Sequence, residues 1–180
     1  MKKLVFATMM CIASMSTNAQ VLTSETVNNA YEKVSNKPNG KFFYNAEKSG
    51  NNITAMFIYK LSSNNGVETL KPHMKYEYTY AANGTLTSKI GYHWDEVRYE
   101  WECSDRYDYA LVDGEYRTEY SRYNNTTNTF DEPTEKMVYS LMPGDSVNNV
   151  SRYHRDSSSN SYQLDSEIKI IEHPVLFAMK

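Results

Sequence analysis

The chain has 180 residues, of which 23% are charged, and a formal net charge of −3. This length fits one ordinary domain that can bury its own core. The mildly acidic balance argues against a nucleic-acid partner and against binding to anionic membranes.

The first 19 residues have the pattern of a secretory signal peptide. Lys2 and Lys3 precede an apolar stretch, and Ala19 ends a run of small residues suited to cleavage. The apolar stretch of about 12 residues is shorter than the roughly 20 that span a bilayer. We therefore expect a signal peptide over 1–19 and a single β-rich domain over 20–180, with no membrane span after cleavage. The protein would be exported and periplasmic, cell-surface or extracellular.

A short helix is expected over residues 24–34. Apolar side chains recur at the spacing of one helix face from Val27 to Val34, and Thr23 or Ser24 precedes them as a cap. A helix of about three turns is marginal unless its apolar stripe packs against something. We expect this helix to lie on a sheet.

From residue 41 onward, the sequence predicts strands. The chain contains 16 tyrosines, all after residue 30, and several recur at every second position, as in Tyr76, Tyr78 and Tyr80. A period of two fits an extended strand, where alternate side chains point to opposite faces. We therefore expect the rings to gather on one face of a sheet and the charged side chains on the other.

Turn residues separate the expected strands. Asn-Gly and Asp-Gly pairs favour tight hairpins because both central residues take a positive φ, and Pro72 is expected to interrupt the chain. The expected turns include Asn65-Gly66, Asn83-Gly84, Asp95-Glu96, Ser104-Asp105, Asp113-Gly114 and Pro143-Gly144. The expected strands are 41–46, 53–61, 74–80, 86–94, 97–103, 107–112, 116–123, 135–142, 147–155 and 162–171.

Short connections of this kind join antiparallel neighbours. The predicted fold is therefore mainly β, an antiparallel meander of about nine to eleven strands with a short N-terminal helix. The sheet would be a twisted single sheet, an open barrel or a sandwich.

The Tyr-x-Tyr strands and Asn-Gly turns that follow the signal peptide resemble a family of small exported, tyrosine-rich proteins of unknown function from Bacteroidetes. The unit Tyr80-Ala-Ala-Asn-Gly-Thr-Leu86 is also distantly similar to the tyrosine–aspartate repeats of secreted wrapping proteins, with Ala81 where those repeats carry aspartate. The resemblance implies a β-meander exported by a Gram-negative bacterium. It carries over no catalytic residue.

The candidate ligand-binding residues are Tyr92, Trp94, Tyr99 and Trp101, which we expect on two adjoining strands. Their rings give large, stiff contact areas with polar tips and would stack on sugars or extended peptides. The alternative is that these rings form the core. The leading hypothesis is a noncatalytic binding or interaction module for a glycan, a peptide or an envelope protein. A structural envelope component that associates with itself is a further alternative.

A polar group at the same turn supports a second hypothesis. His93 and Asp95 are expected to face the same side as Glu100 and Glu102, and an imidazole beside carboxylates would suit a hydrolase acting on an extracellular polymer. The competing interpretation is a surface lattice of opposite charges. Its expected basic members are Lys89, Arg98 and Arg117.

Nothing in the sequence indicates a cofactor or a metal. The four histidines lack close ligand spacing, and the motifs of metalloproteases, serine hydrolases and phosphate-binding loops are missing. Cleavage after Ala19 would remove Cys11. Cys103 would then be a lone thiol on the apolar face, where we expect it to be a small buried side chain.

Overall fold

The computed structural model describes residues 21–36, 40–141, 147–156 and 158–169. The expected signal peptide and the Pro143-Gly144 turn lie outside them. The described residues form one helix and ten strands. These are α2 (Ser24–Ser35), β1 (Phe42–Ser49), β2 (Asn52–Asn64), β3 (Val67–Tyr80), β4 (Leu86–Asp95), β5 (Glu100–Val112), β6 (Glu115–Asn124), β7 (Thr129–Phe130), β8 (Glu135–Leu141), β9 (Val147–Asp156) and β10 (Ser161–Lys169).

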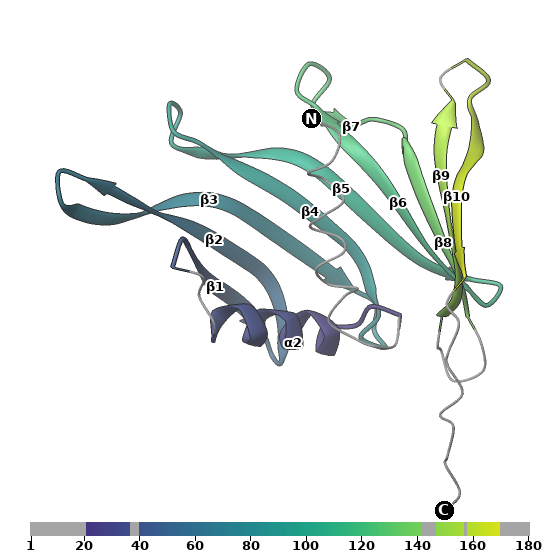
Figure 1. Cartoon of the computed structure of the whole chain (residues 1–180), viewed down its shortest axis with the longest axis horizontal. Helices are drawn as coiled ribbons and strands as arrows, with labels where there is room; N and C mark the ends of the chain where they lie inside the picture. Colours follow the sequence, from purple (N-terminus) through teal and green to yellow (C-terminus); the bar gives the residue numbers. More distant parts are fainter. Residues whose placement is uncertain (1–20, 37–39, 142–146, 157, 170–180) are drawn as a thin grey trace, which may run out of the picture.

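The strands form one open, twisted antiparallel sheet (Figure 1). Its order is β1-β2-β3-β4-β5-β6-β8-β9-β10, and the short β7 pairs with β6 beside this path. Strands that follow one another in the chain are therefore neighbours in space, apart from this side branch. The predicted meander of about nine to eleven strands is confirmed.

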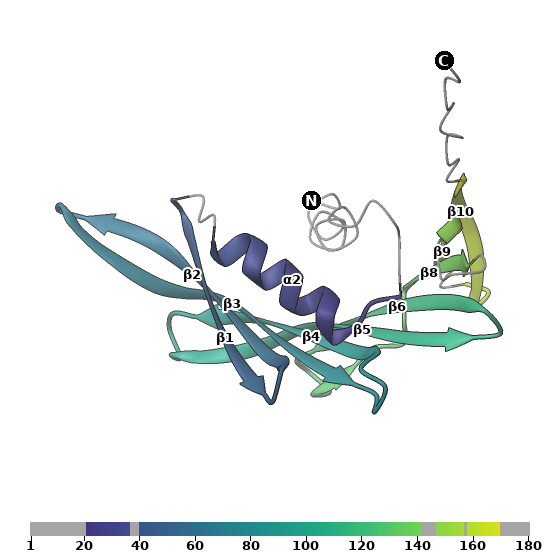
Figure 2. The ribbon, with the colours of Figure 1, turned by 90° about the horizontal axis from the view of Figure 1, so that it is seen from below.

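The predicted helix is also confirmed, and it lies on one face of the sheet (Figure 2). Thr23 caps it, because its hydroxyl accepts a hydrogen bond from the Thr26 backbone N–H at 3.3 Å. Asn28 ties α2 to the sheet, donating to the Asn51 carbonyl at 2.7 Å and accepting from the Ile53 N–H at 3.3 Å. We call the face under α2 the helix-side face and the opposite one the outer face.

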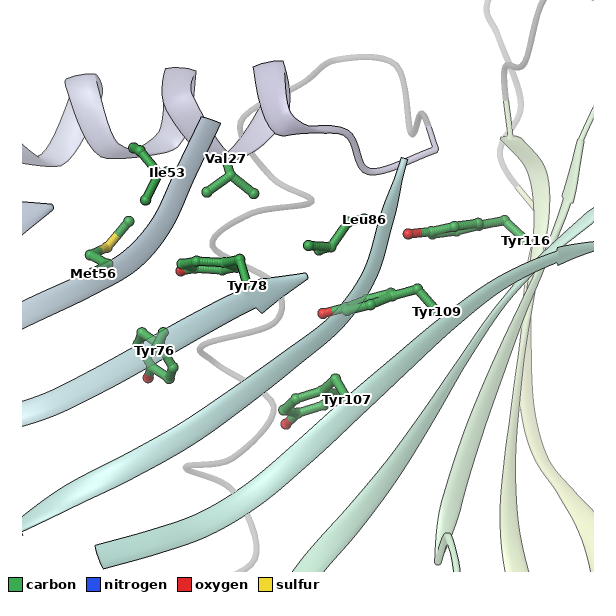
Figure 3. Packing of buried hydrophobic residues seen from close by; sticks show 9 residues of the cluster. All are labelled: Val27, Ile53, Met56, Tyr76, Tyr78, Leu86, Tyr107, Tyr109 and Tyr116. Atoms are coloured by element: carbon green, nitrogen blue, oxygen red, sulfur yellow. The ribbon is translucent and has the colours of Figure 1, made fainter. Parts of the chain in front are cut away.

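The main core lies on the helix-side face. Val27 points from α2 towards the sheet, and the tyrosines of the cluster continue across the strands away from the helix (Figure 3). Ile53 and Leu86 are fully buried. The cluster comprises Val27, Ile53, Met56, Tyr76, Tyr78, Leu86, Tyr107, Tyr109 and Tyr116.

The expectation that the rings gather on one face is wrong. Tyr76 of β3 is paired with Gly91 of β4, so even-numbered residues of β3 share a face with odd-numbered residues of β4. Tyr76 therefore lies on the helix-side face, whereas Tyr92 and Trp94 lie on the outer face. Each face of the sheet carries its own aromatic group.

Two predicted breaks do not occur. Pro72 lies within β3, paired with Tyr59 and next to a β-bulge in which His73 is the extra residue. Proline inside a sheet is found at edges and beside such bulges. Ser104 and Asp105 form no turn, because β5 continues through a second bulge there. Both bulges lengthen a strand where the sequence pattern suggested its end.

The turns themselves follow the sequence in part. Asn65 and Asp113 have φ of 50° and 53°, and each precedes a glycine of positive φ, as tight hairpins require. The Asn83-Gly84 pair instead belongs to a longer connection, in which Thr85 bridges to Thr23. This connection brings the start of α2 onto the sheet.

The pairing of both outermost strands is irregular. Opposite Glu47 and Lys48 of β1, Thr54 of β2 is the extra residue of a bulge, whereas on β10 the extra residue is Asp165, between Leu164 and Ser166. On β1, the side-chain oxygen of Asn45 accepts the neighbouring backbone N–H of Ala46 at 2.9 Å.

Candidate functional site

The outer face carries a cluster of rings at the β4–β5 hairpin. Trp94 and Trp101 lie directly opposite each other, with ring centroids 5.1 Å apart and planes at 69°. Phe57 of β2 adds a third ring 6.2 Å from Trp101. All three are half-buried. Together with Tyr92 of β4, we call these residues the outer aromatic surface.

A charged pair stiffens this surface. The Lys75 ammonium lies 4.0 Å from the centroid of the Tyr92 ring and 6.0 Å from that of Trp101, a favourable cation–π geometry. Glu77 accepts hydrogen bonds from Lys75 at 2.8 Å and from the Tyr92 hydroxyl at 2.7 Å. Burial opposes ionisation of Glu77, but these two hydrogen bonds hold its pKa below the usual value. Glu77 therefore fixes both neighbours.

The expected placement of these rings on two adjoining strands is confirmed for three residues and wrong for one. Tyr92, Trp94 and Trp101 lie on adjoining strands, as expected. Tyr99 instead lies in the turn before β5, with a φ of 57° and 78% of its surface exposed. Phe57 was missed; it lies in the nearly continuous apolar run of residues 53–61, which indicates a strand but not the face on which each side chain lies.

The opposite side of the same hairpin carries the polar group. His93 is paired with Glu102, and Asp95 with Glu100, so these side chains share a face as predicted. The His93 Nε2 lies 3.0 Å from Glu102, whose other oxygen is 2.6 Å from Arg98. Both oxygens of Glu102 are thus engaged.

Asp95 serves the turn itself. It accepts hydrogen bonds from the backbone N–H groups of Arg98 at 3.1 Å and Val97 at 2.7 Å. These bonds lower the pKa of Asp95. The group therefore forms a network of ion pairs around Arg98. In the part of the chain that the structure describes, no group of three or more His, Cys, Asp or Glu residues is arranged to hold a metal ion.

Lys89 is not a surface partner of this lattice, contrary to expectation. It lies on the helix-side face, only 3% exposed, with its ammonium 4.3 Å from the Tyr107 ring and 5.0 Å from the Tyr76 ring. Burial lowers its pKa to about 8, although the charge of Asp105 opposes the shift. Arg117, the other expected partner, pairs with Glu115 instead.

Cys103 lies opposite Tyr92 on the outer face. The thiol is half-buried rather than fully buried. Burial raises its pKa, and the nearby charges of Asp105 and Glu77 raise it further. A thiol held in its protonated form is a poor nucleophile.

The fold and this surface define a class: a single open β-meander with one packed helix and an aromatic outer face. The chain belongs to DUF3836, a family of unknown function whose model matches residues 1–141.

A protein of unknown function from Bacteroides fragilis has a similar structure, with a TM-score of 0.64 and 25% identity over 73% of this chain and 94% of that one. Two DUF3836 proteins match less closely, each with a TM-score of 0.46. The Bacteroides vulgatus protein is 24% identical over 50% of this chain and 88% of that one. The Parabacteroides distasonis protein is 23% identical over 54% and 87%.

None of the curated proteins matches the chain. No helix among the described residues is long and apolar enough to cross a membrane.

Proposed function

We propose that this protein is an exported, noncatalytic binding module whose ligand, a glycan or a peptide, lies against the outer aromatic surface. The observation that carries the proposal is the contact between Trp94 and Trp101, flanked by Phe57 and Tyr92, on the face that α2 leaves uncovered. Export rests on the signal-peptide pattern of the first 19 residues.

The state of the rings supports binding. They are half-buried, so each is anchored at one side and accessible at the other. Tyr92 is further held by Lys75 and Glu77. A surface that is ordered before the ligand arrives loses less entropy when it binds, and tryptophan and tyrosine dominate the energetics of many binding surfaces.

The polar side of the hairpin favours a noncatalytic role. Catalysis by paired carboxylates needs one that is free to exchange a proton or attack the substrate. Glu102 is engaged by His93 and Arg98, and Asp95 caps the turn. This arrangement supports a structural use of the carboxylates.

Trp101→Ala is expected to weaken ligand binding by at least about 10-fold, because it removes the ring between Phe57 and Trp94. An array of oligosaccharides and peptides would supply the ligands. The two tryptophans of the chain are both in this surface, so intrinsic tryptophan fluorescence reports on the site directly. Titrations of the parent protein and of the variant, which keeps Trp94, would measure the change.

Phe42→Ala is the matched control, because its ring lies on the helix-side face of β1, where it stacks on His73. It should leave the affinity unchanged. Equal affinity in Trp101→Ala, with an unaltered circular dichroism spectrum, would remove the basis of the proposal.

A further inference from the structure

The outer aromatic surface is one end of a longer row that crosses the strands. Phe57 of β2 is paired with Lys75 of β3, Lys75 with Tyr92 of β4, and Tyr92 with Cys103 of β5. These four side chains stand directly opposite one another. The row therefore runs at right angles to the strands.

Two more rings continue the row. Tyr123 of β6 lies one position beyond Arg122, which is paired with Asp105. Phe130 of β7 is paired with Tyr123, with ring centroids 5.2 Å apart. We call this set the outer row. Its members are Phe57, Lys75, Tyr92, Cys103, Tyr123 and Phe130, and all are half-buried.

The charges beside the row are compensated internally. Lys75 is paired with Glu77 at 2.8 Å. Arg106, whose guanidinium lies 4.6 Å from the Phe130 ring centroid, is paired with Asp108 at 2.7 Å. A strongly acidic or basic ligand would have to compete with these pairs, at a cost in desolvation. An uncharged ligand that carries hydroxyl groups would instead find both donors and acceptors in place.

The spacing of the row also selects among ligands. Neighbouring strands are about 4.8 Å apart, close to the length of one pyranose unit in an extended glycan. Phe57, Tyr92 and Tyr123 stand on alternate strands, so one ring would meet every second sugar. An extended peptide places side chains of one side about 6.8 Å apart, which does not match. Peptides also add to sheets through strand edges rather than faces.

We propose that an uncharged, extended glycan lies along the outer row, across β2 to β7, with its sugar rings stacked on the aromatic side chains. This inference rests on the proposed function and names its ligand class. The glycan would enter between Phe57 and Trp101 and end over Phe130. Its hydroxyl groups would bond to Lys75, Glu77, Arg106 and Asp108.

The test begins with an array of uncharged linear glycans, acidic glycans and peptides. The uncharged glycan that binds best is then titrated as oligomers of two to six units, followed by tryptophan fluorescence. Affinity should rise with length across the series, because longer chains reach more of the row. Phe130→Leu should weaken binding of the six-unit oligomer by about 10-fold. It should leave the affinity for the two-unit oligomer unchanged. Trp101→Ala should weaken both.

Phe130→Leu keeps an apolar side chain and removes the flat ring, so the end of β7 should stay folded. Tyr153→Phe is the control, because Tyr153 lies on β9, outside the outer row, with the Lys136 ammonium of β8 4.8 Å from its ring centroid. Its affinities should equal those of the parent protein for every length.

The outcomes separate the two proposals. Binding of a peptide or an acidic glycan, with none of the uncharged glycans retained, would overturn the inference and leave the binding module standing. Equal effects of Phe130→Leu on short and long oligomers would overturn the crosswise arrangement. If no ligand of any class changes the tryptophan emission, the proposed function fails as well.

Discussion

Replacement of Leu86 by alanine is expected to lower the free energy of unfolding by about 3–4 kcal/mol. Leu86 is fully buried, and its backbone N–H donates to the Leu22 carbonyl at 2.9 Å, where the chain enters α2. Truncation would leave a cavity at the point where helix and sheet meet. Urea denaturation followed by circular dichroism would measure the loss.

Leu164→Ala is the matched control. Leu164 lies on β10 with 57% of its surface exposed, so the same truncation there should change the free energy of unfolding by less than about 0.5 kcal/mol. Similar losses in the two variants would contradict the burial of Leu86 and the placement of the core on the helix-side face.

Lys89→Met is expected to stabilise the protein by about 2–3 kcal/mol at pH 7. The native state holds the Lys89 ammonium among tyrosine rings, and burial lowers its pKa to about 8 from an ordinary value of 10.5. Below pH 8 the native chain therefore bears the full cost of a buried charge. Methionine fills the space without that cost, although Asp105 loses a favourable neighbour.

The gain should depend on pH in a defined direction. Between pH 8 and 10.5 the native chain has released the proton while the unfolded chain still binds it, so the parent protein gains stability over this range. The advantage of Lys89→Met should shrink as the pH rises and vanish near pH 10.5. The buried tyrosines titrate in both proteins, so their effect cancels in the difference.

Thermal and urea unfolding at pH 7, 8, 9 and 10 would test this dependence. Lys48→Met, at an exposed position of β1, should leave stability nearly unchanged at every pH. A destabilised Lys89→Met variant at pH 7 would mean that the ammonium makes interactions stronger than its burial cost.

Local signals predicted the elements well. Thr23 followed by an apolar stripe predicted α2, and the Asn65 and Asp113 turns marked hairpins correctly, because capping and turn geometry depend on neighbouring residues. The face that each strand presents was not predictable in this way. The face depends on the register between neighbouring strands. A single bulge, such as the one at His73 beside Pro72, shifts that register by one residue.

The same limit explains the candidate site. Trp94 with Trp101, and His93 with Glu102, face each other across one short hairpin, so their proximity follows from the sequence nearby. Phe57 belongs to a strand far earlier in the chain, and its contact with Trp101 requires the whole sheet to assemble. Aromatic alternation alone indicated a strand but gave no information about its distant neighbours.

The two edge strands of the sheet affect whether copies of this protein associate at high concentration. A bare, regular outermost strand invites another chain to dock by its backbone, and that is how fibrils begin. On β1 the Asn45 side-chain oxygen accepts the Ala46 backbone N–H, which an added strand would otherwise bind. On β10 the bulge beside Leu164 interrupts the regular hydrogen-bonding pattern of the edge. We therefore expect both edges to resist pairing with another chain, so that the protein associates through the faces of its sheet rather than by edge-to-edge polymerisation.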